Sequence, residues 1–287
     1  MDIQETKIEL TKYFNKAIFA IHNEGWATHP LRVVQAVKSL IGINISTPNV
    51  KLLTWIKNYI SSLESRSKSE LMLKFGELEE TITIQSLELA VKAGDEKLTF
   101  SHLEQLSRVS DGRPILEFLL ELSVQQSGNS FLFILSSLRS NLFLSNEKIT
   151  ALLILCTQSV LDDSFEEWGL NPDMLTLSST FELSCQILQC HEEDIVRMVK
   201  IAPWLPTVNE ILQISNTDDL FEDSMNIMNV GRQGILDSID KMELNSISTQ
   251  LILMLDAYRS ALKVAPNNIK AIISASSKNI KALIDAK

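Results

Sequence analysis

Histidine and cysteine side chains carry much of the chemistry that a sequence can reveal, and this chain has few of either. Its four histidines lie far apart, and none has a second ligand at the spacing of a metal site. The run His191-Glu-Glu-Asp194 begins an expected helix, where carboxylates complement the helix dipole. The sequence also lacks a Gly-rich phosphate loop and a G-x-S-x-G nucleophile motif. We therefore predict no catalytic residue, no metal site and no cofactor, and we expect that the protein is not an enzyme.

The cysteines and the N-terminal residues indicate the compartment. Cys156, Cys185 and Cys190 form no C-x-x-C pair, and their number is odd, which favours a reducing environment. The first five residues are polar and acidic, unlike a secretory signal. The longest apolar run, 149–156, is far too short to span a bilayer. We expect a cytoplasmic protein without a membrane partner.

The sequence contains aromatic and basic side chains that could bind a ligand, although it contains no catalytic motif. Proteins that bind single-stranded nucleic acid stack bases on aromatic rings and follow the backbone with Lys and Arg. Trp26 lies in a loop after Gly25, with Arg32 close behind, and is interpreted either as such a platform or as a core residue between the first two helices. Trp55 fits an apolar helical stripe and is interpreted as core. The candidate contacts are Trp26, Arg32, Lys57, Arg66, Lys68 and Lys74.

Helical periodicity and helix-start signals predict that these candidate contact residues are positioned by α-helices. We expect an all-α fold, with one β-like patch at 81–84 that runs on into a helix. Ser101 with Glu104 has capping-box spacing, Thr99 is a rival cap, and Ser145 is the expected cap of a later helix. The expected helices include 7–22, 30–41, 48–63, 115–125, 131–142, 147–161, 172–190, 191–201, 221–242, 246–264 and 267–286. Those at 115–125, 131–142 and 147–161 are apolar around most of their circumference, which predicts a buried core.

Charge divides the chain unevenly. Residues 1–114 carry 14 Lys and Arg against 14 Asp and Glu, residues 115–229 carry 4 against 17, and residues 230–287 carry 8 against 5. We expect two helical lobes with an arm and a tail: an arm helix at 1–23, lobes at 24–112 and 113–229, and a helical tail at 230–287. The strongly acidic stretch repels polyanions and is suited to protein partners.

The expected arm helix has one broad apolar face. A terminal helix of this kind packs on its own chain or on a neighbouring protomer. We predict that it mediates self-association into a homo-oligomer. The residues that we expect to form the contact are Ile8, Phe14, Ile18 and Ile21.

Four short segments occur in an order that resembles a known family. They are Asn23-Glu-Gly-Trp26, Arg32-Val-Val34, the run 51–57 and Leu98-Thr-Phe-Ser-His102. Their order and spacing are similar to those of the nucleocapsid proteins of phenuiviruses and tenuiviruses. The resemblance implies a viral protein that coats single-stranded RNA and self-associates, found in host cytoplasm or virion. It places Trp26 beside the RNA cleft, and His102 stands where the family usually has Arg.

Two functions from different classes remain open. One is a nucleocapsid-like protein that binds single-stranded RNA in a cleft between helical lobes. The alternative is an acidic all-α adaptor or scaffold that binds protein partners, through the acidic segment, and no nucleic acid. Both include self-association, so they differ in whether RNA is a partner.

Overall fold

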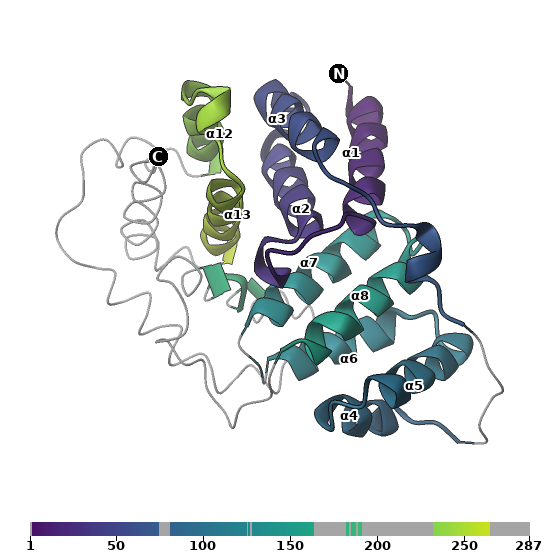
Figure 1. Cartoon of the computed structure of the whole chain (residues 1–287). Coiled ribbons are helices and arrows are strands. Elements are labelled where there is room, and N and C mark those ends of the chain that lie inside the picture. The colour runs from purple at the N-terminus through teal and green to yellow at the C-terminus, as the bar shows by residue number, and fades with distance from the viewer. Residues whose placement is uncertain are drawn as a thin grey trace. The chain divides into compact units, whose positions relative to one another are not determined.

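The computed structural model confirms the all-α class (Figure 1). Among the residues that it describes, β pairing is limited to one isolated bridge between Ala20 and Ser65. The described residues are 2–74, 81–124, 126, 128–163, 182–183, 185–187, 189–190 and 232–264. Within them, every helix is too short or too polar to cross a bilayer.

Where the structure describes the connections, neighbouring helices are joined by short loops or by single turns of 3-10 helix. The α-helices are α1 (Ile3–Ile18), α2 (Pro30–Ile41), α3 (Val50–Ser61), α4 (Ile84–Lys92), α5 (Glu96–Val109), α6 (Arg113–Ser123), α7 (Asn129–Phe143), α8 (Ile149–Leu161), α12 (Arg232–Lys241) and α13 (Thr249–Val264). The 3-10 turns are η1 (Trp26–Thr28), η2 (Gly42–Asn44), η3 (Lys68–Leu71) and η6 (Leu244–Ser246). The expected helices at 191–201 and 267–286 lie outside the described residues.

The chain divides into two compact units. Unit 1 contains Met1–Tyr13, Val33–Ser62 and Pro172–Lys287, and unit 2 contains Phe14–Arg32 and Leu63–Asn171. This grouping differs from the expected lobes, because unit 2 runs across the expected limit between residues 112 and 113. The reason is packing: α5, from before that limit, contacts α8, from after it.

Unit 2 is built on the three apolar helices. α6, α7 and α8 pack against one another (Figure 1). α4 packs against α5, and α5 in turn contacts α8. Most residues of α7 and α8 are buried, as their sequence predicts. Gly112 has φ +84 and lies so close to α8 that a Cβ there would be 2.5 Å from Cγ1 of Ile149. Only glycine fits this position without strain.

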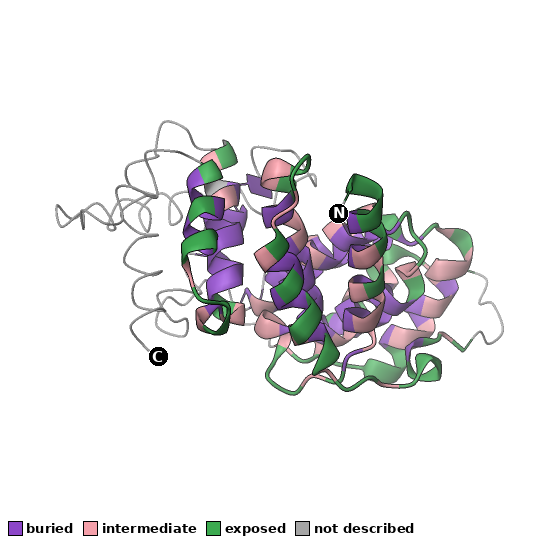
Figure 2. Cartoon of the chain, turned by 90° about the horizontal axis from the view of Figure 1, so that it is seen from above, coloured by how far each residue is buried: buried purple, intermediate pink, exposed green. Residues whose placement is uncertain are grey.

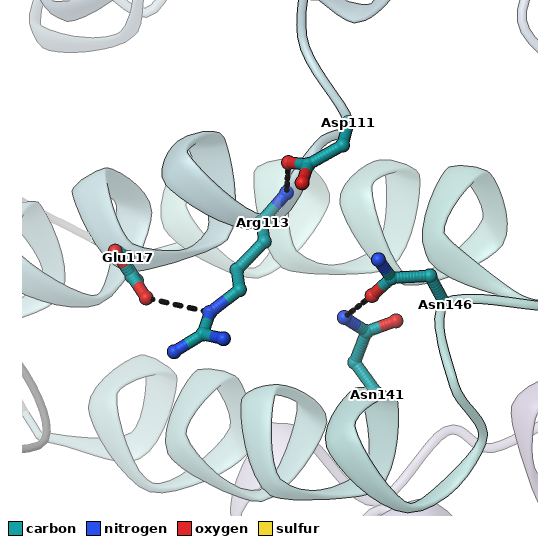
Figure 3. Close-up of polar contacts among 5 residues, drawn as sticks. All are labelled: Asp111, Arg113, Glu117, Asn141 and Asn146. Carbon is teal, nitrogen blue, oxygen red and sulfur yellow. Dashed lines mark hydrogen bonds and ion pairs between the residues drawn. The ribbon is translucent and has the colours of Figure 1, made fainter.

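Local polar contacts fix the start of α6 and the turn between α7 and α8 (Figure 3). The amide of Arg113 donates to Asp111 at 3.1 Å, and its guanidinium pairs with Glu117 at 2.9 Å, one turn along α6. Asn141 donates to the side chain of Asn146 at 2.6 Å. The first two contacts lie on the surface, so each adds little stability but sets where the helix begins.

In unit 1, α3 contacts α12, and α12 contacts α13 and η2. Trp55 is 8% exposed, and its indole N–H donates to the carbonyl of Ile247 at 2.9 Å, in agreement with a core role. Lys51 also reaches across, donating to the carbonyls of Asp240 and Met242. Figure 2 shows that most of the described helices have one buried side and one exposed side.

Several expected caps are wrong. α5 begins at Glu96, with Asp95 as the cap whose carboxylate accepts from the amide of Leu98 at 2.9 Å. Thr99 and Ser101 therefore lie inside the helix. Ser145 has φ 53 and belongs to the turn before α8, which begins after Lys148. The β-like patch at 81–84 contributes an N-cap, because Thr83 accepts from the amide of Ser86.

Candidate functional site

A groove lies between α1 and α3 in unit 1. We call it the α1–α3 groove; its volume is about 740 Å³. Its lining residues are Glu5, Ile8, Glu9, Tyr13, Val50, Leu53, Thr54 and Lys57. Two of them are large apolar side chains left open to solvent: Ile8 is 55% exposed and Val50 is 71% exposed. Leu53 is buried, and the hydroxyl of Thr54 donates within its own helix to the carbonyl of Val50. The groove therefore presents mainly carbon to solvent.

Local folding explains why Ile8 is left outside. α1 starts with a reciprocal cap, in which the amide of Glu5 donates to Asp2 at 2.7 Å and the amide of Asp2 donates to Glu5 at 3.0 Å. The helix then turns Phe14 and Ile18 fully inward, and Phe14 meets the ring of Phe143 at 5.3 Å. Thr6 and Leu10 are buried on the same side, and Ile8 is left on the exposed side of the helix.

Opposite charges line the two walls of the groove. The α1 wall carries Glu5 and Glu9, and the α3 wall carries Lys57. Glu9 accepts from Lys12 at 2.5 Å, and this hydrogen bond is the main reason that its pKa is lowered. The charge of Lys57 lowers the pKa of Glu9 further, although the ammonium of Lys57 forms no hydrogen bond or ion pair with any described residue. The ammonium of Lys57 is thus available to a partner.

A second, shallower groove lies elsewhere in unit 1. It has a volume of about 670 Å³. The rings of Trp55 and Tyr59 stack in parallel at 5.5 Å beside it. Its lining residues are Trp55, Asn58, Tyr59, Glu243, Leu244, Asn245, Ile247 and Thr249. The indole N–H of Trp55 donates to the carbonyl of Ile247, and this hydrogen bond holds the aromatic pair in place. The pair therefore forms part of the groove wall.

Trp26 lies in unit 2, in η1, and its ring is engaged by its own chain. The indole N–H donates to Asp162 at 3.0 Å. The ring lies 4.7 Å from that of Phe133 and is stacked with that of His29 at 5.7 Å. Trp26 is half-buried. A base stacked on it would compete for a ring that already has two aromatic neighbours, and its role in RNA binding stays a prediction.

His29 is the most perturbed titratable group near this loop. It is 3% exposed, and its Nδ1 accepts from the amide of Leu31 at 3.2 Å, which helps to start α2. The pKa of His29 is lowered to about 3, mainly by burial and in addition by the nearby His22, Arg66 and Arg32. His29 is therefore neutral at physiological pH, and its position is typical of a structural histidine.

The other expected RNA contacts differ in exposure, and they belong to both units. Arg32 is 2% exposed, and its guanidinium donates to the carbonyl of Ala27. Arg66 is half-buried and donates to the carbonyl of Ala20 at 3.2 Å. Lys68 and Lys74 are exposed in unit 2, whereas Lys57 belongs to unit 1. Arg32 would have to leave its buried position before it could reach a phosphate.

The four expected self-association residues also divide into two pairs. Phe14 and Ile18 are fully buried within the chain, whereas Ile8 and Ile21 are 55% and 43% exposed. α1 ends at Ile18, so Ile21 lies beyond it in the loop. Self-association through the arm stays a prediction, and Ile8 is the residue of α1 among these four that a partner can reach directly.

Metal binding and thiol chemistry are the two other kinds of site that the described residues bear on. No group of His, Cys, Asp and Glu there could hold a metal ion. Cys156 is buried, and burial raises its pKa to about 12, which keeps the thiol protonated and unreactive. His191 lies outside the described residues.

Comparison of the chain with protein-family models, with curated proteins and with solved structures finds no match. The site must therefore be interpreted from its own geometry. Ile8 and Lys57 were predicted as binding residues from the sequence, Ile8 for self-association and Lys57 for RNA. Their neighbours in the groove, Tyr13, Val50 and Leu53, were not predicted. A β-branched residue at the first position of a helix, such as Val50, is a weak signal by itself.

Proposed function

We propose that this protein is a helical protein-interaction scaffold whose α1–α3 groove binds an α-helical surface of a protein partner. The observation that carries the proposal is the exposure of Ile8 and Val50 on facing walls of one groove. Grooves between helices accept the apolar face of an amphipathic helix, with contacts at one-turn intervals. Glu5 and Lys57 on opposite walls would then select the charges that flank that face.

Charge also favours a protein over a polyanion as the partner. The chain carries a net charge of −10, and the α1 wall of the groove is acidic. An RNA-coating protein gains much of its affinity by neutralising phosphates, which an acidic surface opposes. The exposed apolar side chains, in contrast, gain free energy when another protein covers them.

Photo-crosslinking tests the proposal. Ile8 is replaced by photoreactive benzoylphenylalanine in the full chain, in the cells that produce it, and Leu89 on α4 is replaced in the same way as a control. Leu89 is 63% exposed, so the two sites are equally open to chance encounters. We expect protein adducts from position 8, lost on Val50→Glu, and none of comparable yield from position 89. Equal yields at the two positions, or none at position 8, would contradict the proposal.

RNA binding is the second candidate, and one observation favours it. Lys57, Lys68 and Lys74 are exposed, and none forms an ion pair with a described residue. If Lys68 and Lys74 contact phosphates together with the neighbouring Arg66, changing these three residues to Glu should weaken RNA binding and flatten its dependence on salt. The ultraviolet absorbance ratio of protein purified without nuclease separates the two functions. A ratio of pure protein favours the scaffold, and a ratio typical of bound nucleic acid favours the nucleocapsid.

A further inference from the structure

Self-complementarity of the α1–α3 groove narrows the choice of partner. The acidic residues Glu5 and Glu9 lie on the α1 wall, and the basic Lys57 lies on the α3 wall. The apolar residues divide in the same way, with Ile8 on α1 and Val50 on α3. A surface with opposite charges on its two sides, and apolar groups on both, is complementary to a copy of itself that has been turned over.

We propose that the α1–α3 groove binds a second copy of this chain in a two-fold symmetric contact. This inference rests on the proposed function and names its partner. A two-fold axis that runs along the groove brings α1 of each copy onto α3 of the other. Glu9 of each chain then faces Lys57 of its partner copy, and Ile8 packs against α3 of that copy. Because the contact is isologous, each of these pairs forms twice, and the assembly closes as a dimer.

The size of the surface predicts a weak dimer. α3 has 12 residues, and a helix rises about 1.5 Å per residue, so the shared face is about 18 Å long. Two helices packed side by side are together about 20 Å wide, which gives about 400 Å² per copy. Stable complexes bury about 800 Å² per partner, and smaller interfaces are transient. We therefore expect reversible association in the micromolar range, about 10–100 μM.

Sedimentation of the purified full chain over a range of concentrations tests the proposal. We expect a monomer–dimer equilibrium that Ile8→Glu abolishes and that Lys57→Glu weakens by about tenfold or more, since two attractive contacts become repulsive. Combining Glu9→Lys with Lys57→Glu restores opposite charges across the contact and should recover dimerisation to within about threefold of the natural chain. Leu89→Glu and Lys97→Glu make the same changes on exposed positions of unit 2 and should have no effect.

The outcomes separate this inference from the proposed function. A chain that stays monomeric up to about 1 mM, or a dimer that Ile8→Glu leaves intact, overturns the second-copy proposal. If such a chain still crosslinks from position 8 to a different protein, the scaffold function stands and its partner is that protein. If the charge-reversed pair fails to restore a dimer that each single variant weakens, the two-fold arrangement is wrong. Circular dichroism of each variant confirms that it remains folded.

Discussion

Replacing Trp26 by Ala should destabilise unit 2 by about 2–4.5 kcal/mol. The ring contact with Phe133 at 4.7 Å contributes about 0.5–1.5 kcal/mol. The exposed hydrogen bond to Asp162 contributes about 0.5–1.5 kcal/mol. Half-burial of the indole contributes about 1–1.5 kcal/mol, half of what full burial of a large apolar side chain provides. The expected loss of stability is therefore larger than that of a surface substitution and smaller than that of removing a fully buried ring.

Urea unfolding followed by far-ultraviolet circular dichroism measures this loss without relying on tryptophan fluorescence. Trp26→Phe is the matched control: it keeps the ring contact and loses the N–H donor, so it should cost about 1 kcal/mol. If Trp26→Ala changes the free energy of unfolding by less than about 0.5 kcal/mol, the packing argument is refuted. A loss of RNA affinity at unchanged stability would instead support Trp26 as a stacking platform.

Three further predictions concern the fold. Gly112→Ala should cost more than about 2 kcal/mol in urea unfolding, because its positive φ and the 2.5 Å approach to α8 both oppose a Cβ, whereas Gly94→Ala, with φ +67 and open space around it, should cost only about 1–2 kcal/mol. The pKa of His29 is about 6.5 in the unfolded chain and about 3 in the folded chain. The free energy of unfolding should therefore be highest above pH 6.5 and fall as the pH is lowered from 6.5 to 3. His29→Gln should flatten this pH dependence in unfolding curves measured across the same range. Trp55→Phe leaves the buried carbonyl of Ile247 without its donor and should lower the unfolding free energy by about 1–2 kcal/mol, a smaller change contradicting the role of that bond.

Much of the helical architecture could be predicted from the sequence, including the start of α2 at Pro30, but several helix caps could not. Periodicity located α6, α7 and α8 because burial on nearly all sides leaves a strong apolar pattern. Caps are harder, since Asp95, Thr99 and Ser101 are all chemically suitable. Only Asp95 caps α5, and Glu104 instead accepts from the amide of Lys74 at 2.9 Å. That contact joins residues 30 apart, and no local spacing reveals it.

The candidate site was predictable only in part, for a similar reason. The apolar stripe of α1 identified Ile8 and Phe14 alike, but packing decided that Phe14 is buried and Ile8 is open. Arg32 was expected to contact RNA because it is basic and close to Trp26. Its guanidinium instead donates to the carbonyl of Ala27, which a sequence pattern does not distinguish from a solvated arginine.

Methyl NMR of the isoleucine- and valine-labelled full chain tests most directly whether the α1–α3 groove is a protein-binding surface. The spectra are compared at low and high concentration, and with and without any protein found by crosslinking from position 8. We predict that the methyl signals of Ile8 and Val50 shift together as the partner is added. The signal of Ile21, which is 43% exposed but lies outside the groove, should stay in place. Unchanged signals from Ile8 and Val50 at concentrations where association is complete would contradict the account.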